Sequence, residues 1–235
     1  MVRDLPRTAW SKRYVIMSVD YFTKWVEAKS LIRQDKDQVY QILKEIFTRA
    51  GVTRVLVTDN VIQFTAWKIE DFCTELDIHH IKASQSYPQA NGQVEVMNRV
   101  IFTSLMKRLQ QEGGSWDQEL PTVVWSFRTS PNPIIGETPF SLVYGSDALL
   151  PVEIYADMAW VTYYDELANG KGLLLNLNLL KEKRVFAIGR LAKYKQKVAA
   201  YYNKKVWSRQ FVEGDLVLRA RQATAHGKPG KLESL

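Results

Sequence analysis

The order of apolar patterns in residues 14–83 constrains the fold of this chain more than any other sequence feature. Alternating or β-branched apolar runs mark strands, and apolar side chains three and four positions apart mark helices. In chain order the segments are strands at 14–19 and 24–31, a helix at 36–50, a strand at 53–58, a helix at 66–77 and a strand at 79–83. This β-β-α-β-α-β order predicts an α/β fold with a mixed sheet flanked by helices.

Two acidic residues occupy distinctive places in this arrangement. Asp59 directly follows the buried strand at 53–58, and Glu95 lies near the start of a helical pattern that runs from Gly92 to about Gln111. A carboxylate at a strand end and a carboxylate on a helix can converge on a divalent cation, the arrangement used for phosphoryl transfer. Most acidic residues are solvated surface charges, so the pair gains meaning only from its flanking residues.

The flanking residues form an ordered series of motifs that covers almost the whole chain. The motifs are Asp20–Ala28 (DYFTKWVEA), Thr58-Asp59-Asn60, Gln63-Phe64, Tyr87-Pro88-Gln89, Asn91-Gly92-Gln93, Asn98-Arg99, Gly136–Phe140 (GETPF), Val143-Tyr144-Gly145 and Gly214–Leu218 (GDLVL). Each motif is moderately specific, and the ordered set is much more so. In this order and spacing the chain resembles the integrase of gypsy-class LTR retrotransposons.

The resemblance implies an RNase H-like core in which three carboxylates hold Mg²⁺ or Mn²⁺. Such a core would trim the 3′ ends of element DNA and transfer them into target DNA, as a homo-oligomer and in the nucleus. Asp59 and Glu95 match two of the three catalytic, metal-binding carboxylates. Asn91, Gln93 and Arg99 would position DNA, although Arg99 could instead form an ion pair with Glu95 one turn away.

The first of the three carboxylates has no clear counterpart in this chain. In the family it lies five positions before a Leu-Pro pair, and Leu5-Pro6 places that position just ahead of Met1. Asp4 is a poor substitute because it directly precedes Leu5, and Asp20 belongs to the second strand. We therefore expect a catalytic core whose first strand is largely missing and whose catalysis is impaired.

Two structural consequences are expected from these departures. The first strand of such a sheet is central, so its loss would leave two strands without their shared partner. Val61 stands where the family has Gly, and a β-branched residue would be strained if that position required a positive φ.

Cysteine and histidine content argues against a zinc domain. A His2Cys2 site cannot be built from Cys73 together with His79, His80 and His226. The single cysteine also excludes a disulfide framework, and we expect it to be a small buried residue. No apolar run approaches the roughly 18 residues of a membrane span, and the N-terminus lacks a signal-peptide pattern, so no membrane partner is expected.

Basic residues are concentrated in the C-terminal part of the chain. Residues 1–170 hold 17 Lys and Arg against 21 Asp and Glu, whereas residues 171–235 hold 15 against 4. We predict a helix over 173–205, and its residues Lys193, Lys195 and Lys197 are candidate contacts for a nucleic-acid backbone. A basic run is often only a solvated face, and that alternative stays open.

The same helix carries a narrow stripe at alternating spacings of three and four residues, which fits docking on a partner or on a second copy. The members of the stripe are Leu177, Leu180, Arg184, Ala187, Leu191, Tyr194, Val198 and Tyr201. In the family this region links the core to a small SH3-like barrel. We expect the core at 1–150, a linker and the basic helix at 151–209, and a truncated barrel start with a disordered tail at 210–235.

Two other classes of function remain open beside the integrase. One is a non-catalytic nucleic-acid-binding protein that uses the basic helix, and the other is a structural or oligomerisation module built on the stripe. Metal-dependent strand transfer would separate the enzyme from both, and salt-dependent DNA binding would separate the last two.

Overall fold

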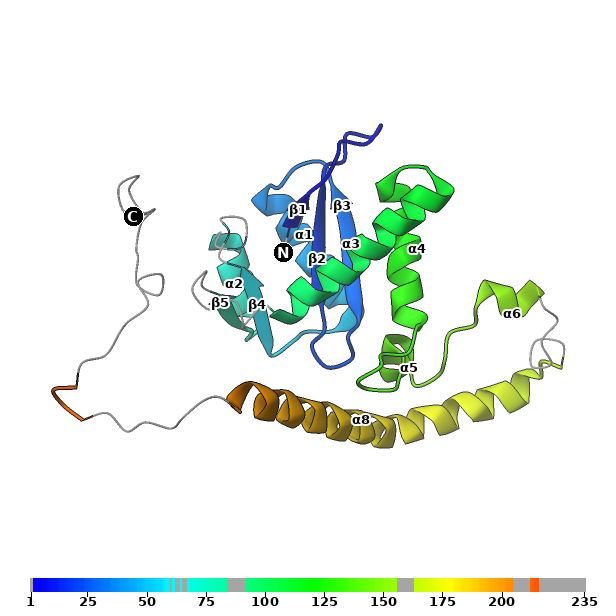
Figure 1. Ribbon diagram of the computed structural model, residues 1–235. Helices are drawn as coiled ribbons and strands as arrows, with labels where there is room; N and C mark the ends of the chain where they lie inside the picture. The colour runs from blue at the N-terminus through cyan, green and yellow to red at the C-terminus, as the bar shows by residue number, and fades with distance from the viewer. Residues whose placement is uncertain are drawn as a thin grey trace.

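The strands of this protein form two separate sheets. In the computed structural model, which describes residues 2–59, 61, 64, 67–83, 92–155, 163–204 and 212–215, the first sheet is antiparallel. It consists of β1 (Val2–Asp4), β2 (Tyr14–Val19) and β3 (Val26–Leu31), in the order β1-β2-β3. The second sheet pairs β4 (Val55–Asp59) with β5 (His79–Ala83) in parallel (Figure 1). The predicted α/β character is confirmed, but the described strands form one antiparallel and one parallel sheet in place of the single mixed sheet that was expected.

The two faces of β2 pack against different helices, because successive strand residues point to opposite sides. Val15 and Met17 share a core with α3 (Gly92–Glu112) and α4 (Trp116–Thr129). Ile16 instead joins a core with α1 (Lys36–Ala50) and α2 (Trp67–Glu75). Cys73 is 2% exposed within this second core, as predicted. Helices thus cover both faces of the hairpin (Figure 1).

Local signals account for where α1 begins and ends. The Asp35 carboxylate accepts a hydrogen bond from the Gln38 backbone N–H at 2.7 Å, which satisfies a donor that the first helical turn leaves unpaired. Gly51 follows the helix at φ 90°, a conformation that residues with a Cβ rarely adopt. The predicted bounds of this helix are therefore reproduced.

The two sheets face each other across unpaired strand edges. β1 pairs only with Tyr14–Ile16 of β2, so residues 17–19 of β2 pair only with β3 among the described residues. β4 likewise has β5 as its only strand partner in the described part of the chain. Residues 17–19 and the whole of β4 line a cavity of about 920 Å³. The cavity therefore lies between the two sheets.

The C-terminal helices begin beyond the core. After α5 (Pro139–Tyr144) and α6 (Pro151–Tyr155), α8 (Glu166–Asn203) runs along the bottom of the molecule in Figure 1. The predicted helix over 173–205 is confirmed, but it starts earlier. The Asp165 carboxylate caps it by accepting a hydrogen bond from the Ala168 backbone N–H at 2.6 Å.

Only the middle of α8 docks on the core. Leu180 and Ala187 are its buried residues, and Ala187 packs with Ile135 and Leu142. Arg184 Nε donates a hydrogen bond to the Leu142 carbonyl at 3.0 Å, and Arg190 Nη1 donates to the Ile135 carbonyl at 2.8 Å. The predicted stripe therefore contacts the core at its centre and leaves both ends of the helix exposed.

The strain considered for Val61 does not occur. Among described residues other than glycine, positive φ values are found at Ser11, Lys24 and Asp77. Most of the segment 210–235, where an SH3-like start was predicted, lies outside the described residues. Within the described part, no helix is both long and apolar enough for a membrane span.

Candidate functional site

Asp59 ends β4 at the wall of the cavity between the sheets. Its side chain is half-buried, and its Oδ1 atom is buried without a hydrogen-bond partner among the described residues. A buried carboxylate oxygen with no partner is costly, because it has left water without gaining a compensating contact. A bound cation would supply that contact.

Glu95 lies in the first turn of α3, next to Val94. Val94 is buried and lines the same cavity as Asp59, whereas the Glu95 side chain is exposed. The predicted helix therefore brings its N-terminal turn to the cavity that Asp59 also borders. Glu95 itself is not among the residues that line the cavity, and its exposed side chain would remain hydrated, so we expect it to contribute less to cation binding than the half-buried Asp59.

The described residues offer two candidate carboxylates at this place, not three. Within the described ranges, no cluster of three or more His, Cys, Asp or Glu side chains is positioned to hold a metal ion. Asp20 also lines the cavity, but its Oδ2 accepts hydrogen bonds from the Thr23 backbone N–H at 3.0 Å and the Thr23 hydroxyl at 2.5 Å. Asp20 therefore closes the turn after β2, in keeping with its exclusion as a ligand.

The residues predicted to position DNA have different surroundings. Gln93 accepts a hydrogen bond from the Lys24 ammonium, so it is anchored to the β2–β3 turn. Arg99 is exposed, and it makes no ion pair with Glu95 among the described residues. Asn91 lies outside the described residues.

Lys24 is the residue at this site that sequence reasoning did not single out. It is 5% exposed and lies at φ 63°, and its ammonium also donates a hydrogen bond to the Tyr21 carbonyl at 2.6 Å. Burial lowers the pKa of Lys24, the nearby charge of Lys195 lowers it further, and Asp20 opposes both effects. Its place inside the DYFTKWVEA motif was the available signal, but the contact with Gln93 could not be read from it.

A second contact stabilises the strand that carries Asp59. Thr58 is buried, and its hydroxyl is 2.9 Å from His80 Nε2 on β5. Burial and the nearby Lys82 lower the pKa of His80, and Glu70 opposes them. The neutral ring is therefore the form that joins the two strands next to Asp59.

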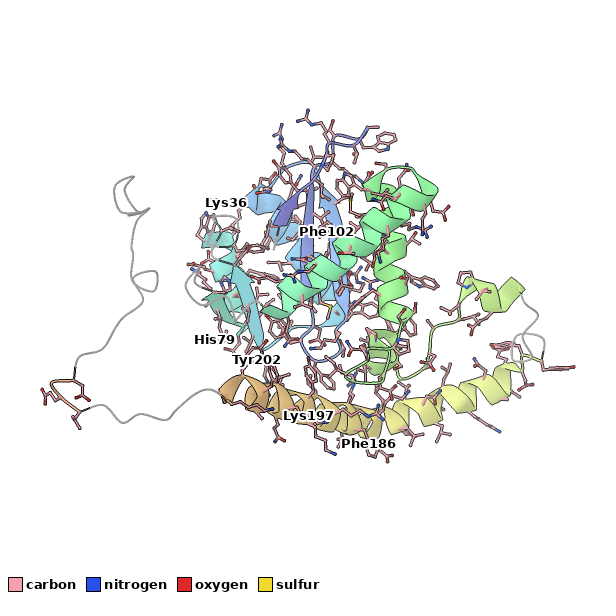
Figure 2. The ribbon with its side chains drawn as sticks, in the orientation of Figure 1. Lys36, His79, Phe102, Phe186, Lys197 and Tyr202 are labelled. Atoms are coloured by element: carbon pink, nitrogen blue, oxygen red, sulfur yellow. The ribbon has the colours of Figure 1, made fainter. Side chains whose placement is uncertain are left out.

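The three lysines predicted to bind nucleic acid lie on the exposed part of α8. Lys193, Lys195 and Lys197 are all exposed, and no ion pair involves them within the described residues. Figure 2 labels Lys197 on the α8 segment that runs beneath the sheets. The positive charge of Lys195 also contributes to the lowered pKa of Lys24.

Comparisons with known proteins agree with this geometry. Residues 4–88 match the family model described as integrase core domain. The Gag-Pol polyprotein of feline leukemia virus is 35% identical over 136 residues, which are 57% of this chain and 8% of that polyprotein. The Pol polyprotein of radiation murine leukemia virus (strain Kaplan) is 35% identical over 136 residues, 57% of this chain and 23% of the relative. The chain thus spans a small part of these relatives.

A solved structure shows the same fold. It is a chain in the cryoEM structure of the simian T-cell lymphotropic virus intasome in complex with PP2A regulatory subunit B56 gamma. The match has a TM-score of 0.52 and 22% sequence identity, and it covers 59% of this chain and 50% of the other. Residues 4–88 are therefore similar to the integrase core domain family, and the mixed α/β fold of this chain is similar to that of the intasome chain.

Proposed function

We propose that this chain is the integrase core segment of a gypsy-class LTR retrotransposon polyprotein. Its activity would be metal-dependent trimming of DNA 3′ ends and transfer of those ends into target DNA. The observation that carries the proposal is the buried Oδ1 of Asp59, which has no hydrogen-bond partner within the described ranges and borders a cavity shared with the first turn of α3. Both acids match positions that hold metal in the family.

The residues present fit a divalent cation. Asp59 and Glu95 are the carboxylates that would hold Mg²⁺ or Mn²⁺, both of which prefer oxygen ligands. Bound there, a cation would polarise a phosphate oxygen and lower the pKa of a water or a 3′-hydroxyl. Gln93 and Arg99 would orient the DNA, and Lys193, Lys195 and Lys197 would contact its phosphates. We also propose that the chain acts in the nucleus as a homo-oligomer.

Catalysis by the chain as it stands is expected to be impaired. Two carboxylates bind a cation more weakly than three, and the open edges of β2 and β4 leave their cavity accessible to water. An added strand in this space would pair with both edges, and an Asp on it could supply a third carboxylate. We therefore expect no measurable strand transfer from the present chain.

A strand-transfer assay with Mg²⁺ or Mn²⁺ tests the proposal. The chain would be compared with a form extended before Met1 by a strand that carries an Asp. We expect cation binding and DNA joining only in the extended form, and their loss on Asp59→Asn or Glu95→Gln. Glu112→Gln is the matched control, because Glu112 is an exposed acid at the other end of α3. An extended form that neither binds cations nor joins DNA would overturn the integrase assignment.

Joining by the unextended chain, abolished by Glu95→Gln, would instead overturn only the proposed impairment. The second candidate is a non-catalytic nucleic-acid-binding protein, which the exposure of the three lysines on α8 favours. Salt-dependent DNA binding without cation binding in either form would support that candidate.

A further inference from the structure

Tyrosines and lysines alternate along one face of α8 near its C-terminal end. Tyr194, Lys197, Tyr201 and Lys204, here called the tyrosine stripe, are separated by three, four and three residues. In a helix with 3.6 residues per turn, such spacing places side chains in one column. The two rings are then roughly 10.5 Å apart along the helix axis, with an ammonium between them.

The rings of this stripe are open to solvent. Tyr194 is 45% exposed and Tyr201 is 69% exposed. The neighbouring Tyr202 is 72% exposed, and its ring meets that of Tyr201 edge-on at 5.5 Å between centroids (labelled in Figure 2). Lys204 Nζ lies 5.9 Å from the Tyr201 ring centroid. A group of exposed aromatic rings at one end of a helix is typical of an interaction surface and not of a solvated face.

The electric charge of this segment favours an anionic partner. After Glu182, α8 contains no acidic residue. Among the described residues the ion pair formed by α8 is Lys183 with Glu137, about three turns before Tyr194. The positive charges around Tyr194 and Tyr201 therefore have no ion-pair partner within the part of the chain that the structure describes, and a polyanion would supply one.

The alternation of rings and ammonium groups distinguishes between polyanions. In a duplex the base faces are stacked on one another, so only the lysines could contribute to binding. In a single strand the bases are free to stack on aromatic side chains while the phosphates contact cations. A column in which both kinds of side chain alternate fits a strand in which bases and phosphates alternate.

We propose that the tyrosine stripe, together with Tyr202, is a binding site for single-stranded nucleic acid, in which unpaired bases stack on the tyrosine rings. The site rests on the proposed function, because the same helix is assigned there to contact DNA phosphates. It adds a preference for unpaired strands that lysines alone would not produce.

Fluorescence anisotropy on the full chain tests the site with a labelled single-stranded DNA oligonucleotide, a duplex of equal length and an abasic single strand. We expect the unmodified chain to bind the abasic strand at least about fivefold more weakly than the normal strand, because each stacked base contributes that much or more. The triple variant Tyr194→Leu, Tyr201→Leu, Tyr202→Leu should lose the same preference. The matching Phe variant should keep it, because Phe retains the ring.

The outcomes separate this site from the proposed function. The site would be overturned if the unmodified chain bound the normal and abasic strands with equal affinity, or if the Leu variant kept the preference for the normal strand. Either result would leave phosphate binding by the lysines intact. A Leu variant that weakens duplex binding equally would also overturn it. If the unmodified chain binds none of the DNA probes, the DNA-binding role itself is overturned. The same role is overturned if the chain binds DNA no more tightly than it binds heparin and Lys→Gln changes on α8 do not alter its affinity for DNA. The abasic strand requires no mutation, so this comparison holds even if a variant folds poorly.

Discussion

Lys24 and Gln93, 69 positions apart in the sequence, are joined by a hydrogen bond from the Lys24 ammonium to Gln93 Oε1. The bond ties the β2–β3 turn to the first turn of α3, two residues before Glu95. Lys24 is buried and has a positive φ, so this contact is maintained against the costs of a desolvated charge and an unfavourable backbone conformation. The position of the Glu95 helix turn thus depends on a residue in the hairpin.

Replacing Lys24 should reveal this coupling. We expect Lys24→Met to lower the free energy of unfolding by about 1–3 kcal/mol, because Gln93 Oε1 and the Tyr21 carbonyl lose their donor. Urea unfolding of Lys24→Met, Gln93→Leu and the double variant gives the interaction energy of the pair. Additive effects of the two single changes would show that the contact does not bind the turn to the helix.

Removing the charge of Asp59 should separate stability from cation binding. Because Oδ1 of Asp59 is buried and has no hydrogen-bond partner among the described residues, Asp59→Asn should leave Tm unchanged or raise it when EDTA is present. Glu95→Gln should have little effect in EDTA, because Glu95 is exposed. In a chain extended by a strand that bears an Asp, Mn²⁺ should raise Tm, and either change should reduce that rise. If Mn²⁺ raised the Tm of the extended Asp59→Asn variant as much as that of the extended chain without this change, Asp59 would be excluded as a ligand.

The contact between His80 and Thr58 predicts a dependence of stability on pH. The pKa of His80 in the folded protein is lowered from its ordinary value of 6.5, chiefly by burial. As pH falls below about 6.5, His80 becomes protonated in the unfolded chain but stays neutral in the folded protein. The free energy of unfolding should therefore decline with falling pH until the lowered pKa of the folded state is reached. Urea midpoints measured from pH 7.5 to 5 should show this decline. In His80→Gln the decline of the urea midpoint should be smaller. If the variant and the unmodified chain show the same pH profile, the decline is caused by other titratable groups.

The sequence predicted most helices and strands because their burial follows a simple period. Apolar residues Val39, Ile42 and Leu43 mark the buried face of α1, and they are all buried in the structure. The start of α8 was placed seven residues too late, since Gly170 and Gly172 disfavour a helix by pattern. The Asp165 cap and the continued backbone hydrogen bonding outweigh those two glycines.

The candidate site was less accessible to sequence reasoning. Asp59 and Glu95 could be named from their motifs, because strand ends and helix starts have local signatures. The role of Lys24 depends on a side chain that crosses between distant segments, and no periodicity encodes such a contact. Tyr194 and Tyr201 were predicted only to be part of a docking face, because a pattern of spacing does not show which portion of a long helix meets the core.

Neutralising Lys193, Lys195 and Lys197 together should change how DNA binding responds to salt. If all three contact phosphates, replacement by Gln should reduce the slope of log K against log salt by about 2–3, since each contact releases counterions. The lysines are exposed and without ion pairs among the described residues, so the fold should be unaffected. Lys36→Gln, Lys44→Gln and Lys107→Gln together form the control, because they remove the same charge from exposed positions outside α8. Equal slopes for the two triple variants would assign α8 to packing or self-association, and the structural-module function would then take precedence.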